Sequence, residues 1–324
     1  MKFLVTGGAG YIGSHMVKYL QNHNHEVVVL DNFSTGHRWA IDQCEIIELD
    51  LLEKFKLRKA LQKRNFDVVI HFAAKSIASE SNQYLEKYYK NNVVGTINLL
   101  DEMLRNDISN IVFSSSAAIF GNPESNKIKE CAPKKPINPY GKSKLMIEQI
   151  LEDMSNKKQI NAICLRYFNA AGAHEDGDLG EAHEPETHLI PNILNSNLNN
   201  DKLTVFGNDY NTPDGTCIRD YIHVSDLVQA HMLSITMIKK NSGFFEYNLG
   251  NGNGFSVIEV IKACEKILGE TINFEFGQRR EGDPDYLVAD SKKAINELGW
   301  EPVFNNLNKI IASAWLWHQK SSIK

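Results

Sequence analysis

The chain has 324 residues, of which 42% are hydrophobic and 23% are charged, and its net charge is −5. This composition is typical of a globular protein, and the length suffices for two domains or for one large α/β domain. The acidic balance provides no basic surface for nucleic acid or an anionic membrane, and no apolar run has the length of a membrane span.

A glycine-rich turn near the start joins a predicted strand to a predicted helix. Residues 2–5 form an apolar run typical of a buried strand, and apolar residues recur at helical spacing over residues 11–20. The turn fits two patterns, Gly8-x-Gly10-x-x-Gly13 and Thr6-Gly7-x-x-Gly10-x-x-Gly13. Such a turn places a pyrophosphate at a helix N-terminus. The alternative is a tight turn that only requires positive φ.

The second predicted strand, residues 26–31, ends on Asp31, 18 residues after Gly13. A carboxylate at this place accepts a hydrogen bond from a ribose 2′-hydroxyl and repels a 2′-phosphate. We therefore expect NAD rather than NADP, the alternative being an aspartate that merely ends a strand.

Apolar strands and helices then alternate through the first half of the chain. The predicted strands are residues 44–49, 67–72, 111–113 and 163–165, and the predicted helices are residues 52–63, 83–104 and 140–154. This alternation predicts an α/β fold with a Rossmann-type doubly wound parallel sheet, covered by helices on both faces. Ligands bind such sheets beyond the carboxyl ends of the strands.

The composition changes after Asn169, where residues 170–191 are predicted to form a loop and a boundary. We expect a helix over 222–238 and a strand over 244–249, then helices over 257–268, 291–298 and 307–317. The predicted domains are an NAD-binding Rossmann domain, residues 1–170 with 222–250 returning to it, and a smaller C-terminal α/β substrate domain, residues 171–324.

No metal site is expected. His183 and His188 resemble a zinc-protease pair, but they are five residues apart with Pro185 between them, so they would not share a helical face. The five cysteines show no C-x-x-C spacing, which favours free thiols in a reducing cytoplasm, and the glycine turn follows the start too closely for a signal peptide.

The residues most suggestive of catalysis are Tyr140 and Lys144, which lie one turn apart on a predicted helix. A phenol must lose about 3 pKa units to act as a base near pH 7, and a neighbouring ammonium favours that change. Ser114, Ser115 and Ser116 follow an upstream strand, where a hydroxyl could meet the same substrate oxygen. The alternative is an ordinary tyrosine and lysine at a helix start.

Together these motifs resemble the extended short-chain dehydrogenase/reductases, and the later ones narrow the match to the UDP-glucose 4-epimerase family. The motifs that carry the resemblance are Thr6-Gly7-x-x-Gly10-x-x-Gly13, Asn91-Asn92-Val93, Ser114–Ser116, Tyr140-x-x-x-Lys144, Leu165–Asn169, Gly207–Tyr210, Asp214–Thr216, Ile218–Val224 and Arg279-Arg280-x-Gly282-Asp283. The resemblance extends from Met1 to about Trp317.

The resemblance implies an NAD-dependent isomerase of nucleotide-sugar metabolism that forms a homodimer. Tyr140 would remove the proton of the sugar 4-hydroxyl, assisted by Ser116, while Lys144 lowers the pKa of Tyr140 and holds the nicotinamide ribose. Tightly bound NAD would take a hydride from C4 and return it to the opposite face of the 4-keto sugar.

The same resemblance assigns binding residues. The implied cofactor residues, besides Tyr140 and Lys144, are Gly7, Gly10, Tyr11, Ile12, Gly13, Asp31, Asn32, Ser34, Thr35, Asp50, Leu51, Phe72, Ala73, Ala74, Ser76, Asn92 and Phe168. The implied UDP-hexose residues, besides Ser116 and Tyr140, are Asn169, Leu189, Phe206, Arg219, Arg280, Asp283 and Leu287.

Several residues depart from the family pattern. Ala118 and Phe120 replace a frequent Thr and Tyr, Ser76 stands where many members have Lys, and His188 replaces a frequent Asn. Leu287 is intermediate in size between residues associated with simple hexoses and with N-acetylhexosamines. A UDP-N-acetylglucosamine or dual-specificity 4-epimerase is therefore the alternative, with a sugar-nucleotide dehydratase, a dehydrogenase or a non-catalytic regulator less favoured.

Overall fold

The computed structural model describes residues 1–280 and 283–321, which form two compact units. Unit 1 comprises Met1–Ile119, Pro136–Arg166 and Val228–Tyr247, and unit 2 comprises Phe120–Lys135, Tyr167–Leu227 and Asn248–Lys324. The structure groups residues 120–135 with unit 2, whereas the sequence-based domain boundaries left them in the first domain; those boundaries stay a prediction. Gly282, one of the motif residues, lies outside the described residues.

Unit 1 is built on a seven-stranded sheet with the strand order β10-β6-β5-β4-β1-β2-β3. The pairs β1–β2, β2–β3, β1–β4 and β4–β5 are parallel. The order reverses between β1 and β4, which is where ligands bind doubly wound sheets. The predicted Rossmann-type fold is confirmed. The strands are β1 (Lys2–Thr6), β2 (Glu26–Asp31), β3 (Glu45–Glu48), β4 (Val68–His71), β5 (Asn110–Ser116), β6 (Asn161–Tyr167) and β10 (Phe244–Leu249).

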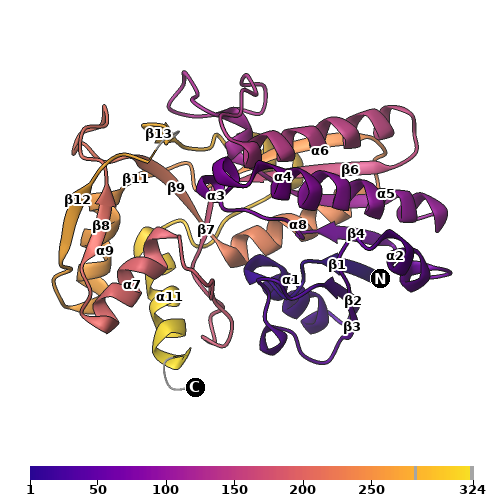
Figure 1. Ribbon diagram of the computed structural model, residues 1–324, viewed down its shortest axis with the longest axis horizontal. Helices are drawn as coiled ribbons and strands as arrows, with labels where there is room; N and C mark the ends of the chain where they lie inside the picture. The colour runs from indigo at the N-terminus through magenta and orange to yellow at the C-terminus, as the bar shows by residue number, and fades with distance from the viewer. Residues whose placement is uncertain (281–282, 322–324) are drawn as a thin grey trace. The chain divides into compact units, whose positions relative to one another are not determined.

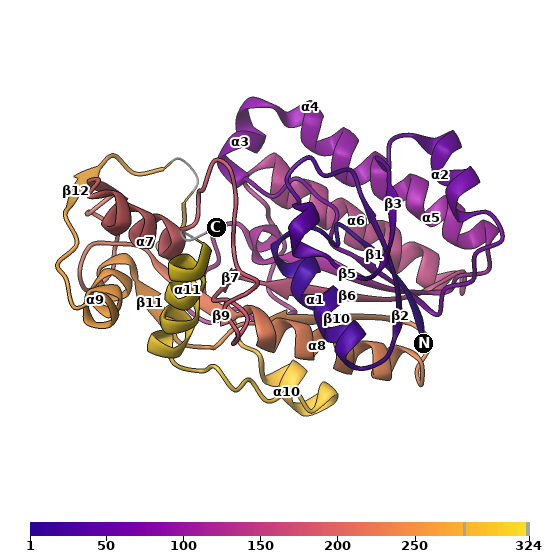
Figure 2. The ribbon, with the colours of Figure 1, turned by 90° about the horizontal axis from the view of Figure 1, so that it is seen from below.

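Helices cover both faces of this sheet (Figures 1 and 2), with α2, α5 and α6 on one face and α1 and α8 on the other. The first three pack Leu57, Leu99, Met103, Ile147 and Leu151 into one core with strand residues such as Leu4 and Ile111. The helices are α1 (Tyr11–Asn22), α2 (Lys54–Leu61), α3 (Ala78–Gln83), α4 (Leu85–Tyr88), α5 (Gly95–Arg105), α6 (Pro139–Asn156) and α8 (Val224–Ile238).

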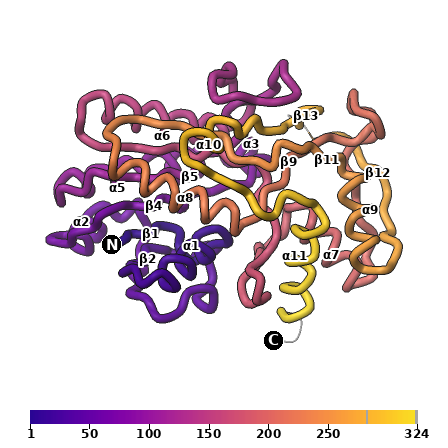
Figure 3. The backbone as a smooth tube through the Cα atoms, turned by 180° about the vertical axis from the view of Figure 1, so that it is seen from behind, coloured from indigo at the N-terminus to yellow at the C-terminus, as the bar shows by residue number. Residues whose placement is uncertain are grey.

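Unit 2 combines short strands with three packed helices. Strands β11, β9 and β13 are neighbours in one sheet, β7 pairs with β9, and β8 pairs with β12. Helices α7, α9 and α11 lie side by side and share an apolar core (Figures 1 and 3). The elements are β7 (Asn169–Ala171), β8 (Leu203–Phe206), β9 (Ile218–His223), β11 (Gly254–Ser256), β12 (Phe274–Gly277), β13 (Tyr286–Leu287), α7 (Leu189–Asn199), α9 (Val257–Leu268), α10 (Lys292–Leu298) and α11 (Leu307–Ser321).

Three predicted elements have a different kind of structure over part of their length. The predicted helix 83–104 is interrupted by a π-helical turn, Tyr89–Val94, between α4 and α5. The predicted helix 222–238 begins only at Val224, because the two residues before it complete β9. Helix α7 begins inside the predicted loop 170–191, and its Pro191 falls in the first turn, where a missing N–H costs nothing. None of the helices in the described part of the chain has the length and apolar character of a membrane span.

A buried ion pair fixes α6 against the sheet. The Arg166 guanidinium on β6 donates to both carboxylate oxygens of Glu148 on α6, with Nε–Oε1 and Nη2–Oε2 distances of 2.9 and 2.7 Å. Both side chains are almost fully buried, and the Ser115 hydroxyl of β5 also donates to Glu148, at 2.5 Å. This two-point geometry compensates for the removal of both charges from water.

We expect Glu148→Gln to lower the free energy of unfolding by about 3–5 kcal/mol, because it removes the charged two-point partner of the buried Arg166, and the Glu246 carboxylate lies farther away, at 3.7 Å. Urea denaturation measures the change. The matched control is Glu152→Gln on the exposed side of the same helix, for which a change within about 0.5 kcal/mol is expected. Equal effects of the two substitutions would contradict this interpretation.

Candidate functional site

The glycine turn between β1 and α1 has the geometry of an anion site. Gly7 has φ of 70°, and a Cβ there would lie 2.5 Å from the Ala73 backbone nitrogen. A Cβ on Gly13 would lie 2.1 Å from the Gly7 carbonyl oxygen. Helix α1 starts after Gly10 with no side-chain cap, so no side chain competes for its first N–H groups. A pyrophosphate fits this helix start.

Acidic and amide side chains follow the neighbouring strands. The buried Asp31 carboxylate accepts hydrogen bonds from the N–H groups of Ala9, at 2.9 Å, and Phe33, at 2.8 Å. The Asn32 side chain donates to Asp50 at 2.8 Å and accepts from the Ser34 N–H at 3.0 Å. Asp31 is thus anchored beside the glycine turn, and it retains lone pairs that can accept a ribose hydroxyl.

Lys75 is a candidate cofactor residue that the sequence analysis missed. Its Nζ donates to the Ser34 hydroxyl at 3.1 Å, whereas the neighbouring Ser76 is exposed. The Asn92 side chain hydrogen-bonds both the N–H and the carbonyl of Lys75, at 2.8 and 3.0 Å. Burial lowers the pKa of Lys75, against the opposing effect of carboxylates that include Asp31 and Asp50. The signal in the sequence was that Lys75 directly precedes Ser76, the position at which many family members have lysine.

The other predicted cofactor residues of unit 1 follow the carboxyl ends of its strands or begin the helices there. They are Tyr11 and Ile12 at the start of α1, Thr35 after β2, Leu51 after β3, and Phe72, Ala73 and Ala74 after β4. The Phe72 ring lies 4.9 Å from the His231 ring. Phe168 belongs to unit 2.

The three predicted catalytic residues lie together in unit 1. Ser116 ends β5, and its side chain hydrogen-bonds Tyr140 at the start of α6. The buried Lys144 Nζ donates to the Ser114 carbonyl at 2.6 Å and lies 5.9 Å from the centroid of the Tyr140 ring. A backbone contact sets this arrangement, because a Cβ on Gly141 would lie 2.4 Å from the Ala118 carbonyl oxygen.

The N-terminus of α6 is well defined by its sequence. Pro139 occupies the first turn, and the Asn138 side chain accepts a hydrogen bond from the Gly141 N–H at 2.8 Å. Tyr140 therefore lies at a capped and packed helix start rather than on a frayed end.

Burial shifts the pKa values of both ionisable residues toward their neutral forms. It raises the pKa of the Tyr140 phenol, an effect that the hydrogen bond to Ser116 partly offsets. It lowers the pKa of Lys144 to about 7, although Cys164 and Glu148 oppose the shift.

A buried hydrogen-bond chain links the glycine turn to Asn92. The Thr96 hydroxyl donates to the Asn92 carbonyl, so it must accept from Nε2 of His71, at 2.8 Å. Nδ1 of His71 then accepts from Thr6, at 2.6 Å. Burial lowers the pKa of His71 to about 3, helped by the charge of Lys144, so this imidazole is neutral.

The neutral His71 makes stability depend on pH. Its folded pKa of about 3 lies below the ordinary histidine value of 6.5, so the unfolded chain takes up a proton first as the pH falls. Stability is full above pH 6.5 and is lost toward pH 3, at about 1.4 kcal/mol per pH unit for this one group. Urea unfolding measured from pH 7 to 4.5 should show that the free energy of unfolding depends less steeply on pH in His71→Gln than in the parent. The control His23→Gln, at an exposed histidine, should keep the pH dependence of the parent. An unchanged pH dependence in His71→Gln would refute the prediction.

Most predicted substrate residues lie on neighbouring elements of unit 2. Arg219 on β9 donates to the Asp283 carboxylate at 2.7 Å and is in register with Leu287 on β13. The Asn169 side chain on β7 donates to the Asp220 carbonyl at 3.0 Å. The Arg280 guanidinium lies 4.2 Å from the centroid of the Phe206 ring. Leu189 is the first residue of α7 and packs on the core of unit 2.

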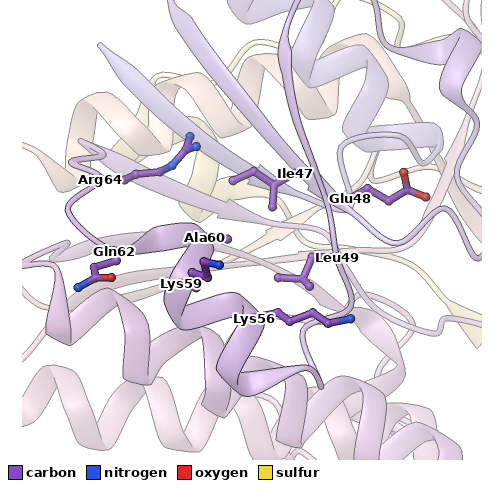
Figure 4. Close-up of a pocket in the computed structure, with 8 residues that line it drawn as sticks. All are labelled: Ile47, Glu48, Leu49, Lys56, Lys59, Ala60, Gln62 and Arg64. Atoms are coloured by element: carbon purple, nitrogen blue, oxygen red, sulfur yellow. The ribbon is translucent and has the colours of Figure 1, made fainter.

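A pocket of about 500 Å³ lies elsewhere in unit 1, between β3 and α2 (Figure 4). None of the predicted site residues lines it. Two of its three basic side chains are engaged locally: Arg64 pairs with Glu45 at 2.6 Å, and Lys56 pairs with Glu53. The lining residues are Ile47, Glu48, Leu49, Lys56, Lys59, Ala60, Gln62 and Arg64.

Comparison with known proteins gives consistent matches. The model of the "NAD dependent epimerase/dehydratase family" matches residues 3–250. A UDP-glucose 4-epimerase from Lactobacillus helveticus is 47% identical over 321 residues, covering 98% of this chain and 97% of that relative. The solved structure of UDP-glucose 4-epimerase from Bifidobacterium longum, in complex with NAD+ and UDP, has a TM-score of 0.95, 37% identity and 99% coverage of both chains. The UDP-Glc/GlcNAc 4-epimerase from Campylobacter jejuni is 40% identical, with a TM-score of 0.84 and coverage of 98% of this chain and 99% of that chain.

Proposed function

Because this chain belongs to the NAD dependent epimerase/dehydratase family, we propose that it interconverts UDP-galactose and UDP-glucose through a 4-keto intermediate. The observation that carries the proposal is the hydrogen bond between Ser116 and Tyr140 beside the buried Lys144. This arrangement lies in a Rossmann unit with a helix start suited to a pyrophosphate. The chain is also similar over nearly its full length to UDP-glucose 4-epimerases.

Tyr140 is the proposed base. Its phenolic oxygen takes the proton of the sugar 4-hydroxyl, and the Ser116 hydroxyl orients that oxygen by hydrogen bonding. Lys144, held by the Ser114 carbonyl, supplies an ammonium close to the Tyr140 ring when it is protonated. NAD, which the glycine turn and Asp31 would hold, would supply the hydride chemistry at C4, and its positive charge would favour the phenolate.

Unit 2 supplies the proposed nucleotide-sugar residues. Guanidinium groups suit a diphosphate because their planar forks bind phosphate oxygens. Arg219 is 9% exposed and already oriented by Asp283, and Arg280 is supported by the Phe206 ring. In Bifidobacterium longum the related enzyme was solved in complex with UDP, and we extend that ligand class to this chain.

A dehydratase is the less favoured function, because water elimination needs an acid where this chain has Ala117 and Ala118. A dual-specificity 4-epimerase is the principal alternative, since the relative from Campylobacter jejuni is a UDP-Glc/GlcNAc 4-epimerase.

The deciding experiment supplies UDP-galactose to the purified protein without added NAD and identifies the products. UDP-glucose is expected. A 4-keto-6-deoxy product would indicate a dehydratase, accumulation of NADH on addition of NAD would indicate a dehydrogenase, and no product under either condition would refute catalysis of this class.

We predict that Tyr140→Phe lowers kcat by at least about 10²-fold, the lower range for loss of a general base. Binding of UDP-sugar and the NAD content should change little, because the ring and its packing remain. Steady-state kinetics, together with nucleotide release on denaturation, measure both quantities. Near-normal turnover would show that another group is the base.

The protein should purify with NAD or NADH tightly held, and Lys75→Met should reduce that content. The Lys75 ammonium lies 3.1 Å from the Ser34 hydroxyl, so its loss removes a favourable charge for a pyrophosphate. We expect a roughly 10-fold weaker affinity for NAD, about 1.4 kcal/mol. Nucleotide released by denaturation and calorimetric titration test this. The control Lys90→Met, whose ammonium pairs with Glu86 on the surface, should retain parent values; equal losses would refute a role for Lys75.

Substrate breadth is predicted to depend on Leu287, a partly buried residue beside Arg219 in the sheet of unit 2. An N-acetyl group pressed against a packed leucine costs about 1–3 kcal/mol, so UDP-galactose should be favoured over UDP-N-acetylgalactosamine. Leu287→Ser should narrow the difference in kcat/KM between the two sugars. Equal values in the parent, or no gain in the variant, would rule out Leu287 as the residue that limits the sugar.

We also propose a homodimer in the cytoplasm. The outer surface of α4, α5 and α6 exposes apolar side chains, which supports self-association through these helices. Tyr84, Leu85, Val94, Ile97, Leu104 and Met146 make up this apolar surface. All five cysteines are free thiols, which suits a reducing compartment.

A further inference from the structure

The segment that leads into α7 folds so that four potential metal ligands face one another. We call Glu181, His183, Glu186 and His188 the His–Glu cluster. Each residue offers one ligand atom, and these atoms all lie within 4.8 Å of one another. The sequence analysis expected no metal because the two histidines cannot share a helical face. The structure places them in a loop instead, where their spacing of five residues is no obstacle.

The distances within the cluster are those of a compact coordination sphere. The Nδ1 atoms of His183 and His188 lie 3.1 and 2.6 Å from the Glu181 Oε1 atom. They lie 3.8 and 3.0 Å from oxygens of Glu186. Ligands at 2.0–2.2 Å from a tetrahedral zinc ion are separated by about 3.3–3.6 Å. Small side-chain adjustments therefore bring the four atoms around one ion.

The charge of the cluster suits a divalent cation. The Glu181 and Glu186 side chains are only 5% and 10% exposed, so two carboxylates are buried together. Two carboxylates and two neutral imidazoles sum to −2, which one divalent ion balances. Zinc accepts both histidine nitrogen and glutamate oxygen, whereas magnesium and calcium prefer oxygen alone.

The surrounding backbone holds the cluster in place. The Trp317 indole on α11 donates to the Glu181 carbonyl at 3.1 Å, and a Cβ on Gly180 would lie 2.3 Å from the Trp317 ring. The N–H groups of Thr187 and His188 donate to the Glu186 carboxylate at 2.7 and 2.8 Å. Hydrogen bonds of this kind orient ligands in established metal sites.

We propose that the His–Glu cluster binds one zinc ion, which fixes the loop between β7 and α7. The proposed role is structural, and zinc binding is measured separately from the proposed epimerase activity. The competing occupants of the cluster are protons. Although burial acts in the opposite direction, hydrogen bonds to Glu181 and Glu186 raise the pKa of His183 to about 9. A cluster that holds only protons would consist of imidazolium–carboxylate pairs.

The test uses the full-length protein, stripped with a chelator and titrated with zinc at pH 8. We expect one zinc ion per chain by elemental analysis after gel filtration. Cobalt(II) substituted at the same site should give the intense visible absorption of a tetrahedral nitrogen–oxygen environment. At a zinc concentration 100 times Kd, the folding equilibrium should shift about 100-fold toward the folded state. Binding well below one equivalent, or only the weak spectrum of octahedral cobalt, would overturn the proposal.

Variants locate the ion. His183→Gln and His188→Gln should each weaken zinc binding by at least about 100-fold, because each removes a direct ligand. The matched control is His174→Gln in the neighbouring group of His174, Asp176 and Asp178, which should bind zinc like the parent. Loss of zinc in the control alone, or unchanged affinity in both cluster variants, would refute the assignment. The cobalt spectrum of the parent keeps the proposal testable if a cluster variant fails to fold.

Discussion

The ion pair between Glu148 and Arg166 is the constraint on which the geometry of unit 1 depends. Each of these charges loses several kcal/mol of hydration on burial, and the two-point contact, together with the Ser115 hydrogen bond and the Glu246 carboxylate, compensates for that loss. Helix α6 therefore has essentially one satisfactory position against β5 and β6. Since α6 carries Tyr140 and β5 ends at Ser116, this buried pair also sets the distance between the two hydroxyl groups.

The start of α6 is fixed independently. The side chain of Asn138 caps the helix, and Gly141 packs on the backbone of Ala118 so closely that no larger residue fits. A similar logic applies at the glycine turn, where Gly7 contacts Ala73 backbone to backbone. The His71 hydrogen-bond chain then couples that turn to Asn92, and Asn92 holds the backbone of Lys75. Polar groups that are all satisfied internally thus position the loops at the carboxyl end of the sheet.

The elements that could be predicted from the sequence are those whose buried residues form a continuous or regularly spaced apolar pattern. Strands 26–31 and 244–249 and helix 257–268 have the predicted bounds, because their apolar residues are continuous or regularly spaced. The strands of unit 2, β7, β8, β9, β11, β12 and β13, were not predicted, since each has only two to six residues and little periodicity. The π-helical turn before α5 was missed because its composition is helical throughout. The roles of Lys75 and of the His–Glu cluster were not predicted for a different reason. Loop conformations determine which residues they contact, and residue spacing alone does not encode those conformations.

Burial acts on the charge states of both Tyr140 and Lys144. The spacing of four residues places Lys144 on the same helical face as Tyr140. Its Nζ donates to the Ser114 carbonyl and lies 5.9 Å from the centroid of the Tyr140 ring. The same burial raises the pKa of the phenol and lowers that of the amine to about 7, so the two shifts have one cause. Burial of these two groups therefore opposes the charges that catalysis requires. The protein alone favours the neutral phenol, and the base form depends on positive charge that arrives with the bound reactants. Reactivity of Tyr140 is in this way tied to occupancy of the site rather than to a permanently ionised residue.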